Sequence, residues 1–420
     1  MSSQVVAIRR SARLLSHDVT NLSHSDVIPL AIKRKEPDTL PDGVSSVKRS
    51  RKRRIVSEPT YLIPSVQPKE TQFKGRLGYA CLNTVLRNKK PGSESVFCSR
   101  TCRLDTIKKN GLHWVKDLGR KNVDDLLTII QWNEENNIRF FRISSEMFPF
   151  ASHAVHGYSL DYCAAELAKA GALSKKYGHR LTVHPGQYTQ LGSPKAAVVE
   201  AAVRDLAYHC EMLDLMGLGP DSVMVIHGGG VYGDKPTTLE RLKRSIRSLP
   251  DNICNRLVLE NDEMCYNAED LLPICEELNV PLVFDYHHDT LYPSSISPAQ
   301  IIERATVIWA RRGIKPKQHL SEQRPGAVTI MERRAHSDRC ERLPDYLPID
   351  MDLMIEAKDK EQAVLHLYRI YDLQPVIHAS LRPPAANQSK ETNGRKSNRR
   401  THIIVKEEIA DGAEATSTSN

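Results

Sequence analysis

Short apolar runs alternate with amphipathic stretches through the middle of the chain. Seven of the eight runs are almost continuously apolar before their polar ends, which is typical of parallel strands covered on both faces. The runs are Arg76–Cys81, Arg139–Ser145, Arg180–Pro185, Ser222–His227, Arg256–Asn261, Pro281–His287, Lys315–Leu320 and Asp352–Ala357. Stretches with helical periodicity lie between most of them, at Val123–Asn136, Asp161–Tyr177, Ala196–Met216, Thr238–Ser248, Ala268–Leu278 and Pro298–Arg311.

Eight strands that alternate with helices over about 300 residues predict an α/β fold, a single (β/α)8 TIM barrel. An open doubly wound sheet usually has a glycine-rich turn after its first strand, and Leu77–Leu82 has no such turn. The segment Gln323–Ile349, between the seventh and eighth strands, has little periodicity. A loop of that length in a compact domain usually has a function.

Both ends of the chain are predicted to be polar tails outside a barrel domain at residues 76–378. Residues 1–75 are rich in Ser, Pro and basic side chains and are expected to be disordered, as are residues 379–420. Two basic clusters, Lys33–Lys35 and Lys48–Arg54, predict a nuclear import signal that import receptors would read, and they could also hold DNA without sequence preference. Residues 1–17 contain three arginines before any acid, so a mitochondrial presequence is the weaker alternative.

The excess of positive charge lies in these tails. Residues 1–76 contain 15 basic and 7 acidic side chains, and residues 379–420 contain 7 and 5. Residues 77–378 therefore hold 37 basic and 39 acidic side chains. Any binding of a polyanion by the barrel must come from a local patch or from bound cations.

Two further features bear on where the protein works. No apolar run reaches the roughly 18 residues of a membrane span, so we expect no membrane partner. The nine cysteines are scattered, and the nearest pair, Cys98 and Cys102, has no matching second pair. This argues against a structural zinc site and favours a reducing compartment. We expect a monomer.

From the third strand onward, every predicted strand ends at residues that can bind a metal. These residues are His184, His227, Glu260, Asp285 with His288, Lys317 with His319, and Glu356. In a barrel the C-terminal ends of the strands form one ring around the mouth, where active sites of this fold lie. A single histidine there is more often a hydrogen-bonded core residue. Six consecutive strand ends favour a polynuclear metal site instead, since bound cations would relieve the repulsion between carboxylates.

The number of candidate ligands indicates two or three divalent ions, because one catalytic zinc needs about three protein ligands. His336, in the long loop, is a further candidate, and Arg333 and Arg334 beside it could clamp phosphates; the alternative is an ordinary surface loop. Mixed His and carboxylate ligands suit manganese or zinc, with magnesium as another possibility. Clustered ions suit phosphodiester hydrolysis by an activated water.

Aromatic and amide side chains near the predicted mouth suggest a nucleic-acid contact. Gln187 and Tyr188 follow the third strand and could stack against bases, although such a turn is more often structural. Tyr79 and Asn83 are expected to face the same rim. The nucleophile-elbow and P-loop patterns are absent, which argues against serine hydrolases and nucleoside triphosphatases.

In order along the chain, several motifs resemble the ultraviolet damage endonuclease family, which is related to endonuclease IV. They are Leu-Gly-Tyr-Ala-Cys (77–81), Phe-Arg-Ile-Ser-Ser (141–145), His-Pro-Gly-Gln-Tyr (184–188), Ile-His-Gly-Gly-Gly (226–230), Leu-Glu-Asn-Asp-Glu (259–263), Phe-Asp-Tyr-His-His (284–288), Ala-His-Ser-Asp (335–338) and Met-Ile-Glu-Ala-Lys (354–358). The long basic tail is similar to that of fungal members.

The resemblance implies an enzyme that nicks duplex DNA immediately 5′ to cyclobutane pyrimidine dimers and 6-4 photoproducts, leaving 3′-hydroxyl and 5′-phosphate ends. It also implies action at abasic sites. The residues that match the family's metal ligands are His184, His227, Glu260, Asp285, His288, His319, His336 and Glu356.

By the same resemblance, Glu260 would bridge two ions, and Lys317 matches a lysine that is carboxylated near the metals. Glu260, Lys317, His184 and Glu356 are the catalytic candidates. Gln187 and Tyr188 match a pair that wedges into the duplex opposite a flipped-out lesion, and Tyr79 and Asn83 match residues that contact the damaged nucleotides. His153 is a further candidate site residue.

Three alternatives remain at this point. The first is an enzyme for abasic sites alone. The second is a sugar-isomerase-like barrel, although such sites depend more on carboxylates than on histidines. The third is an inert barrel attached to a DNA-binding tail.

Overall fold

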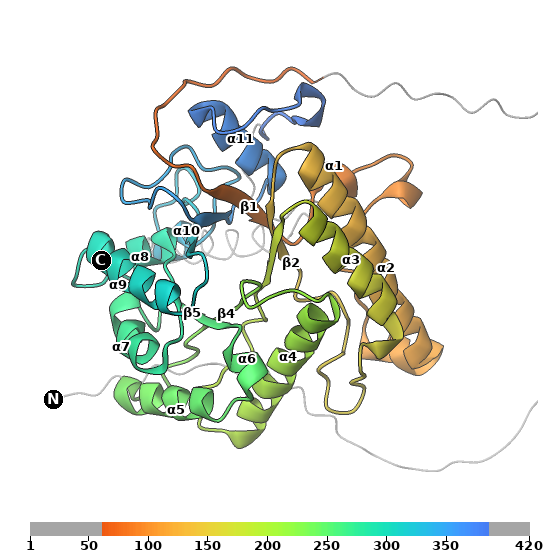
Figure 1. Ribbon diagram of the computed structural model, residues 1–420, viewed down its shortest axis with the longest axis vertical. Coiled ribbons are helices and arrows are strands. Elements are labelled where there is room, and N and C mark those ends of the chain that lie inside the picture. The colour runs from red at the N-terminus through yellow and green to blue at the C-terminus, as the bar shows by residue number, and fades with distance from the viewer. Residues whose placement is uncertain (1–60, 386–420) are drawn as a thin grey trace, which may run out of the picture. The chain divides into compact units, whose positions relative to one another are not determined.

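All eight apolar runs form strands, as predicted. The computed structural model describes residues 61–385, and its eight strands belong to one parallel sheet (Figure 1). The strands are β1 (Arg76–Ala80), β2 (Phe140–Ile143), β3 (Arg180–Val183), β4 (Met224–His227), β5 (Leu257–Glu260), β6 (Leu282–Val283), β7 (Lys317–Leu320) and β8 (Asp352–Ile355).

The sheet closes into a barrel. Neighbours run in the order β6, β5, β4, β3, β2, β1, β8, β7, so the first and last strands of this order are β6 and β7. A single parallel bridge, between Asp285 and His319, joins them, and the backbone N–H of His319 donates to the carbonyl of Phe284 at 3.0 Å. This arrangement confirms the (β/α)8 barrel.

Helices surround the strands in Figure 1, and they largely follow the predicted stretches. In residues 61–385 they are α1 (Thr84–Arg87), α2 (Leu104–Glu135), α3 (Ala164–Lys176), α4 (Ala196–Leu215), α5 (Lys235–Arg247), α6 (Asp251–Cys254), α7 (Ala268–Leu278), α8 (Tyr286–Leu291), α9 (Pro298–Arg311), α10 (Ile330–Arg333) and α11 (Glu361–Tyr371). Three short 3-10 turns, η1 (Gly92–Glu94), η2 (Asp161–Cys163) and η3 (His378–Ser380), complete them.

The short helices α1, α6, α8 and α10 were not predicted, and neither were two longer helical segments. Helix α2 begins at Leu104, nineteen residues before the predicted start at Val123, and Gly111, with a φ of 80°, divides it into two pieces. The first piece has few apolar positions, so its periodicity is weak. Helix α11 follows the last strand and packs on β1.

An ion cluster ties three strands together at the N-terminal end of the barrel. Asp352 at the start of β8 is fully buried and accepts hydrogen bonds from Arg76 Nε at 2.7 Å and from Arg180 Nη1 at 2.9 Å. Arg76 and Arg180 begin β1 and β3. Burial alone would raise the pKa of Asp352, but the two guanidinium groups outweigh it and hold that pKa below its usual value.

The predicted tails lie mostly outside the described residues, and so do both basic clusters. Residues 61–75, which we assigned to the N-terminal tail, are described and contact the barrel. The backbone N–H groups of Lys69 and Lys74 donate to the carbonyls of Ile370 and Ile349, and Phe73 is buried. The domain boundaries and the import signal stay predictions.

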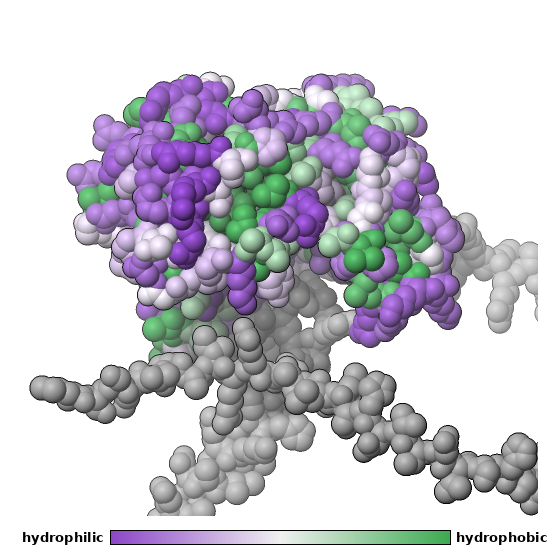
Figure 2. All heavy atoms as spheres, turned by 90° about the horizontal axis from the view of Figure 1, so that it is seen from below, coloured by the Kyte–Doolittle hydropathy of each residue, from purple (hydrophilic) through white to green (hydrophobic). Residues whose placement is uncertain are grey.

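The described surface carries no feature of a membrane span. Within residues 61–385, no helix combines the length and the apolar character needed to cross a bilayer. On the face shown in Figure 2, hydrophilic side chains surround smaller hydrophobic areas. The nine cysteines all lie in the described part, and none forms a disulfide.

Candidate metal centre

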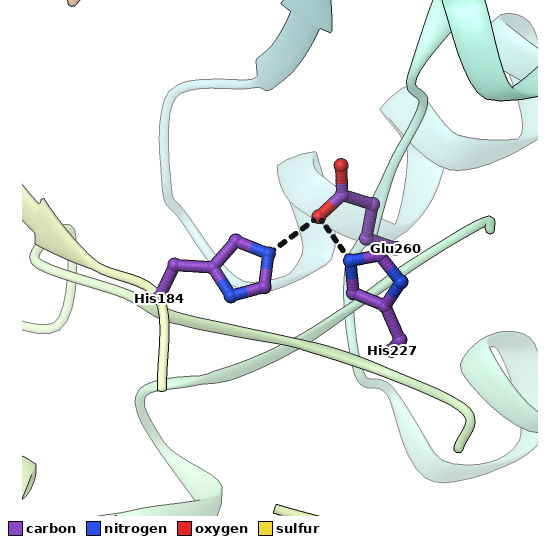
Figure 3. Close-up of side chains that lie close together, drawn as sticks. All are labelled: His184, His227 and Glu260. Atoms are coloured by element: carbon purple, nitrogen blue, oxygen red, sulfur yellow. Dashed lines mark hydrogen bonds and ion pairs between the residues drawn. The ribbon is translucent and has the colours of Figure 1, made fainter. Parts of the chain in front are cut away.

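Glu260 is the centre of the predicted ring of ligands. It ends β5, where its side chain is fully buried, and β5 pairs with β4 so that Glu260 lies opposite His227. Its Oε2 atom is 3.0 Å from His184 Nε2 and 3.3 Å from His227 Nε2, and Figure 3 shows the two imidazoles pointing at this oxygen. Its other oxygen, Oε1, is 2.6 Å from His319 Nδ1.

Three groups of side chains in the described residues could each hold an ion, and Glu260 belongs to all three. Within each group the possible ligand atoms lie within 4.8 Å of one another. The groups are His184–His227–Glu260, Glu260–His319–Glu356 and Glu260–Asp285–His288. The structure therefore brings together seven of the eight predicted ligands around one carboxylate.

The charges around Glu260 favour its ionised form. Burial alone would raise its pKa, but His319 and His227 outweigh burial and hold the pKa well below the usual range. Glu356 behaves in the same way: Arg142, which forms an ion pair with it, and His319 hold its pKa well below the usual value against the effect of burial. Both carboxylates are thus ready to bind a cation.

The two side-chain oxygens of Asp285 differ in their surroundings. Its Oδ1 atom caps helix α8 by accepting the backbone N–H groups of His287 and His288, each at 2.8 Å. Among the described residues, Oδ2 has no hydrogen-bond partner although it is buried. A buried carboxylate oxygen without a donor is costly, and a bound cation would remove that cost. The donor set therefore fits divalent metal ions.

The imidazole of His288 lies near two of these carboxylates, with its Nδ1 3.9 Å from Glu260 Oε1 and 3.9 Å from Asp285 Oδ1. Its Nδ1 donates to the carbonyl of Asn261 at 2.9 Å. Burial alone would lower its pKa, but Asp285 and Glu260 outweigh burial and raise it to about 9. The two carboxylates therefore stabilise the charged form of this imidazole.

Lys317 lies inside the barrel behind the ligands. It is fully buried, and its Nζ contacts His319 Nε2. Burial, together with the nearby Arg142, lowers its pKa to about 7, so that the neutral amine is accessible near neutral pH. Its carboxylation stays a prediction.

His336 is the one predicted ligand outside the three groups. Its Nδ1 donates to the backbone carbonyl of Glu356 at 2.6 Å, and its ring lies 5.4 Å from that of His287. His287 was not singled out from the sequence. Its buried Nε2 has no hydrogen-bond partner among the described residues, and burial and His336 lower its pKa to about 4.

The two predicted phosphate clamps are both engaged within the protein. Arg334 Nε donates to Glu263 Oε1 at 3.0 Å, and the other oxygen of Glu263 lies 3.7 Å from His288 Nε2. Arg333 Nε donates to Gln323 Oε1 at 3.1 Å. Arg334 thus connects the long loop to the metal centre through Glu263 rather than presenting an unpaired cation.

A pocket of about 720 Å³ opens beside the ligands. Its walls include His184, Gln187, Tyr188, His227, Glu263 and Met264. Tyr188 is 81% exposed, and Gln187 is also exposed, as expected for a pair that projects from the mouth.

A second tyrosine, missed from the sequence, supports the Gln187–Tyr188 turn. The hydroxyl of Tyr232, in the β4–α5 loop, donates to Gln190 Oε1, and Gln190 Nε2 donates to the carbonyl of Gln187 at 3.2 Å. Tyr232 has a positive φ of 52°. Its neighbouring glycines signalled a special backbone, but the sequence alone could not indicate the partner.

The predicted position of Tyr79 and Asn83 on the rim needs correction. Tyr79 is fully buried, packs edge-on against Phe141, and donates its hydroxyl to Asn133 Oδ1 at 2.6 Å. Asn83 is 1% exposed and caps α1 by accepting the backbone N–H of Leu86. Both side chains lie in the layer between strand and helix, and neither lines the pocket.

His153 also lies apart from the three metal-binding groups. It is in the loop after β2, where its Nδ1 accepts the backbone N–H groups of Val155 and His156 at 3.0 and 3.1 Å. These bonds shape its own turn.

The chain is similar to known proteins over most of the described residues. The model of the family described as UV-endonuclease UvdE matches residues 75–382. The UV-damage endonuclease of Schizosaccharomyces pombe is 45% identical over 378 residues, which cover 84% of this chain and 62% of the relative. That of Neurospora crassa is 50% identical over 343 residues, covering 72% and 52%. The chain therefore spans only about half to three fifths of these two fungal relatives.

The fold is also similar to that of a solved structure. The crystal structure of SacUVDE superposes with a TM-score of 0.61 at 29% sequence identity, and the match covers 70% of this chain and 96% of that one.

Proposed function

Because this chain belongs to the UV-endonuclease UvdE family, we propose that it is a metal-dependent DNA-repair endonuclease. It nicks duplex DNA immediately 5′ to cyclobutane pyrimidine dimers and 6-4 photoproducts, and also acts at abasic sites, leaving 3′-hydroxyl and 5′-phosphate ends. The observation that carries the proposal is Glu260, which three metal-binding groups share beside an open pocket.

The three groups around Glu260 would hold two or three divalent ions, with manganese the first choice and zinc or magnesium the alternatives. When bound, such ions polarise the phosphate oxygens, lower the pKa of an attacking water and stabilise the leaving oxygen. The residues 77–378 carry no excess of positive charge, so the ions also supply much of the attraction for phosphate.

Residues behind the ligands fix their orientation. Arg142 forms an ion pair with Glu356, and Lys317 contacts the imidazole of His319. Partners of this kind hold ligands in place and typically contribute 10- to 100-fold in metal affinity or activity, an order-of-magnitude figure.

The pocket beside the ligands suits nucleotides that have left the stack. It is wide enough for bases, at about 720 Å³, and Ile143, Ile226 and Met264 supply apolar surface. Rotating a nucleotide out of the duplex costs a few kcal/mol, and less where a lesion already weakens stacking. Gln187 and Tyr188, at the rim, would fill the gap that the damaged nucleotides leave.

Replacement of Glu260 tests the reaction. Glu260→Gln keeps the shape of the side chain but removes the charge shared by the three groups, so nicking of ultraviolet-irradiated plasmid should fall to background while binding of damaged DNA survives. Glu303→Gln, an exposed glutamate of α9, is the matched control and should nick normally. Retained nicking by Glu260→Gln would contradict the proposal.

Defined oligonucleotides separate the substrate classes. Duplexes that carry one pyrimidine dimer, one 6-4 photoproduct or one abasic site should all be nicked, and the end groups identify the bond that is cut. Cleavage of the abasic duplex alone would replace the proposal with an abasic-site endonuclease.

A further inference from the structure

A second, smaller pocket lies on the outer wall of the barrel, where α5 approaches the loop that precedes α4. Its volume is about 240 Å³, and its lining residues are Ser193, Arg241, Arg244, Ser245 and Ser248, which we call the Arg244 pocket. Among the residues that the structure describes, two guanidinium groups and three hydroxyls line it and no carboxylate does. Such a wall offers hydrogen-bond donors and positive charge to an anion.

Arg241 connects this pocket to the mouth of the barrel. Its Nε donates to the carbonyl of Gly192 at 3.1 Å, and its Nη2 donates to Thr238 Oγ1 at 2.6 Å. Gly192 lies next to Gly228, since a Cβ atom at Gly192 would be in ordinary van der Waals contact, at 3.5 Å, with the Gly228 carbonyl oxygen. Gly228 directly follows His227, a member of the metal-binding groups. The pocket is therefore anchored beside the loop that carries Gln187 and Tyr188.

Arg244 differs from the neighbouring arginine Arg247 in its contacts. Within residues 61–385, its guanidinium makes no hydrogen bond or ion pair, whereas Arg247, one turn further along α5, pairs with Glu277. Two of the hydroxyls have local partners: Ser193 Oγ accepts the backbone N–H of Lys195, and Ser248 Oγ donates to the carbonyl of Ser245. Arg244 is exposed and can turn toward a ligand at the surface.

We propose that the Arg244 pocket binds a backbone phosphate of the DNA duplex outside the reaction centre, an inference that rests on the proposed function. A guanidinium matches the geometry of a phosphate, and half or more of the hydrogen bonds between proteins and DNA go to the backbone. A barrel without a net positive charge needs such local cationic sites to hold a duplex. Figure 2 looks onto the side where α5 lies in Figure 1, and hydrophilic side chains cover most of the left half of that face.

The salt dependence of DNA binding tests the contact. Each neutralised phosphate contributes about 0.9 to the slope of log K against log salt concentration, which corresponds to about eightfold in affinity at 0.1 M salt. Arg244→Gln should therefore lower the slope by about 0.9 and weaken binding about eightfold, equally for damaged and undamaged duplex, with an unchanged nicking rate at saturating enzyme. Arg247→Gln removes the same charge from the same helix outside the pocket and should leave the slope unchanged.

Shortening the duplex provides a second measurement. As base pairs are removed from one end, the wild-type protein should lose affinity in a step when the contacted phosphate disappears, and Arg244→Gln should lack that step. An unchanged slope in Arg244→Gln, or equal losses in the two variants, would overturn the Arg244 pocket while leaving the proposed function intact. Failure of the wild-type protein to prefer irradiated DNA would overturn the proposed function itself.

Discussion

At the scale of single residues, the distinction that matters is between side chains that face the substrate and side chains that hold them in place. Tyr188 is exposed at the rim, but Tyr232 and Gln190 connect its turn to the neighbouring β4–α5 loop. The backbone carbonyl that accepts from Gln190 belongs to Gln187. The position of the Gln187–Tyr188 pair therefore depends on a hydroxyl that lies in another loop.

Removal of that hydroxyl should weaken recognition of the lesion. In Tyr232→Phe the ring remains but the bond to Gln190 is lost, and a hydrogen bond of about 1 kcal/mol corresponds to roughly fivefold in affinity. We expect about fivefold weaker binding to lesion-containing duplex, measured by fluorescence anisotropy, and little change for undamaged duplex. The matched control is Tyr177→Phe, which removes the hydrogen bond from Tyr177 to Gln131 Oε1 between α3 and α2. Equal effects of the two variants would show that the turn does not need Tyr232.

At the scale of elements, the two ends of the strands have different tasks. Ligands lie at the C-terminal ends of β3, β4, β5, β7 and β8 or directly after them. At the opposite, N-terminal ends, Asp352 and two arginines join β1, β3 and β8. This division is typical of the barrel fold, in which one face serves chemistry and the other serves stability.

Breaking the Asp352 cluster should destabilise the barrel without touching the metal centre. Asp352→Asn leaves two arginines without their carboxylate, and loss of one partner of a buried ion pair costs about 3–5 kcal/mol. Urea unfolding followed by circular dichroism measures the change. Asp350→Asn is the matched control, because Asp350 is an exposed partner of Lys315 at the surface and its pair contributes little.

The lowered pKa of Asp352 predicts that the stability of the fold depends on pH. Its pKa is lowered in the folded protein, so its contribution to stability is present above the unfolded pKa of about 3.9 and is lost as the pH falls through the folded value. Acid should therefore destabilise the wild-type protein more steeply in this range than it destabilises Asp352→Asn. Parallel acid transitions in the two proteins would contradict the assigned role of Asp352.

At the scale of the whole molecule, the metal centre coincides with the seam of the barrel. Strands β6 and β7 are joined by the single bridge between Asp285 and His319, and both residues belong to the metal-binding groups around Glu260. An ion bound there would stabilise the contact between β6 and β7 that closes the barrel.

Metal should therefore stabilise the fold as well as support the reaction. A ligand that binds only the folded state adds about 2.7 kcal/mol at a concentration 100 times its Kd. We expect manganese to raise the midpoint of thermal unfolding, chelator to reverse the rise, and Glu260→Gln to show a much smaller rise than Glu303→Gln. A midpoint that does not respond to manganese, zinc or magnesium would contradict the metal centre, whatever the nicking assay shows.

The sequence by itself determined the strands and most of the ligands. Apolar runs of strand length with polar ends are local signals, and in a parallel barrel all C-terminal strand ends meet at one face, so His184, His227 and Glu260 could be assigned to one site before their distances were known.

Only the tertiary structure decided whether each side chain near the metal centre points into the barrel or toward the helices, and which residue it pairs with. In strands covered on both sides, the apolar pattern does not say which alternate positions point into the barrel, and for this reason Tyr79 was expected at the rim but lies under the helices. The pairing of Arg334 with Glu263, the hydrogen bond from Tyr232 to Gln190, and the Arg244 pocket each join segments that are distant in sequence. Such contacts depend on how loops of different strands are placed against one another, and no local pattern in the chain encodes that placement.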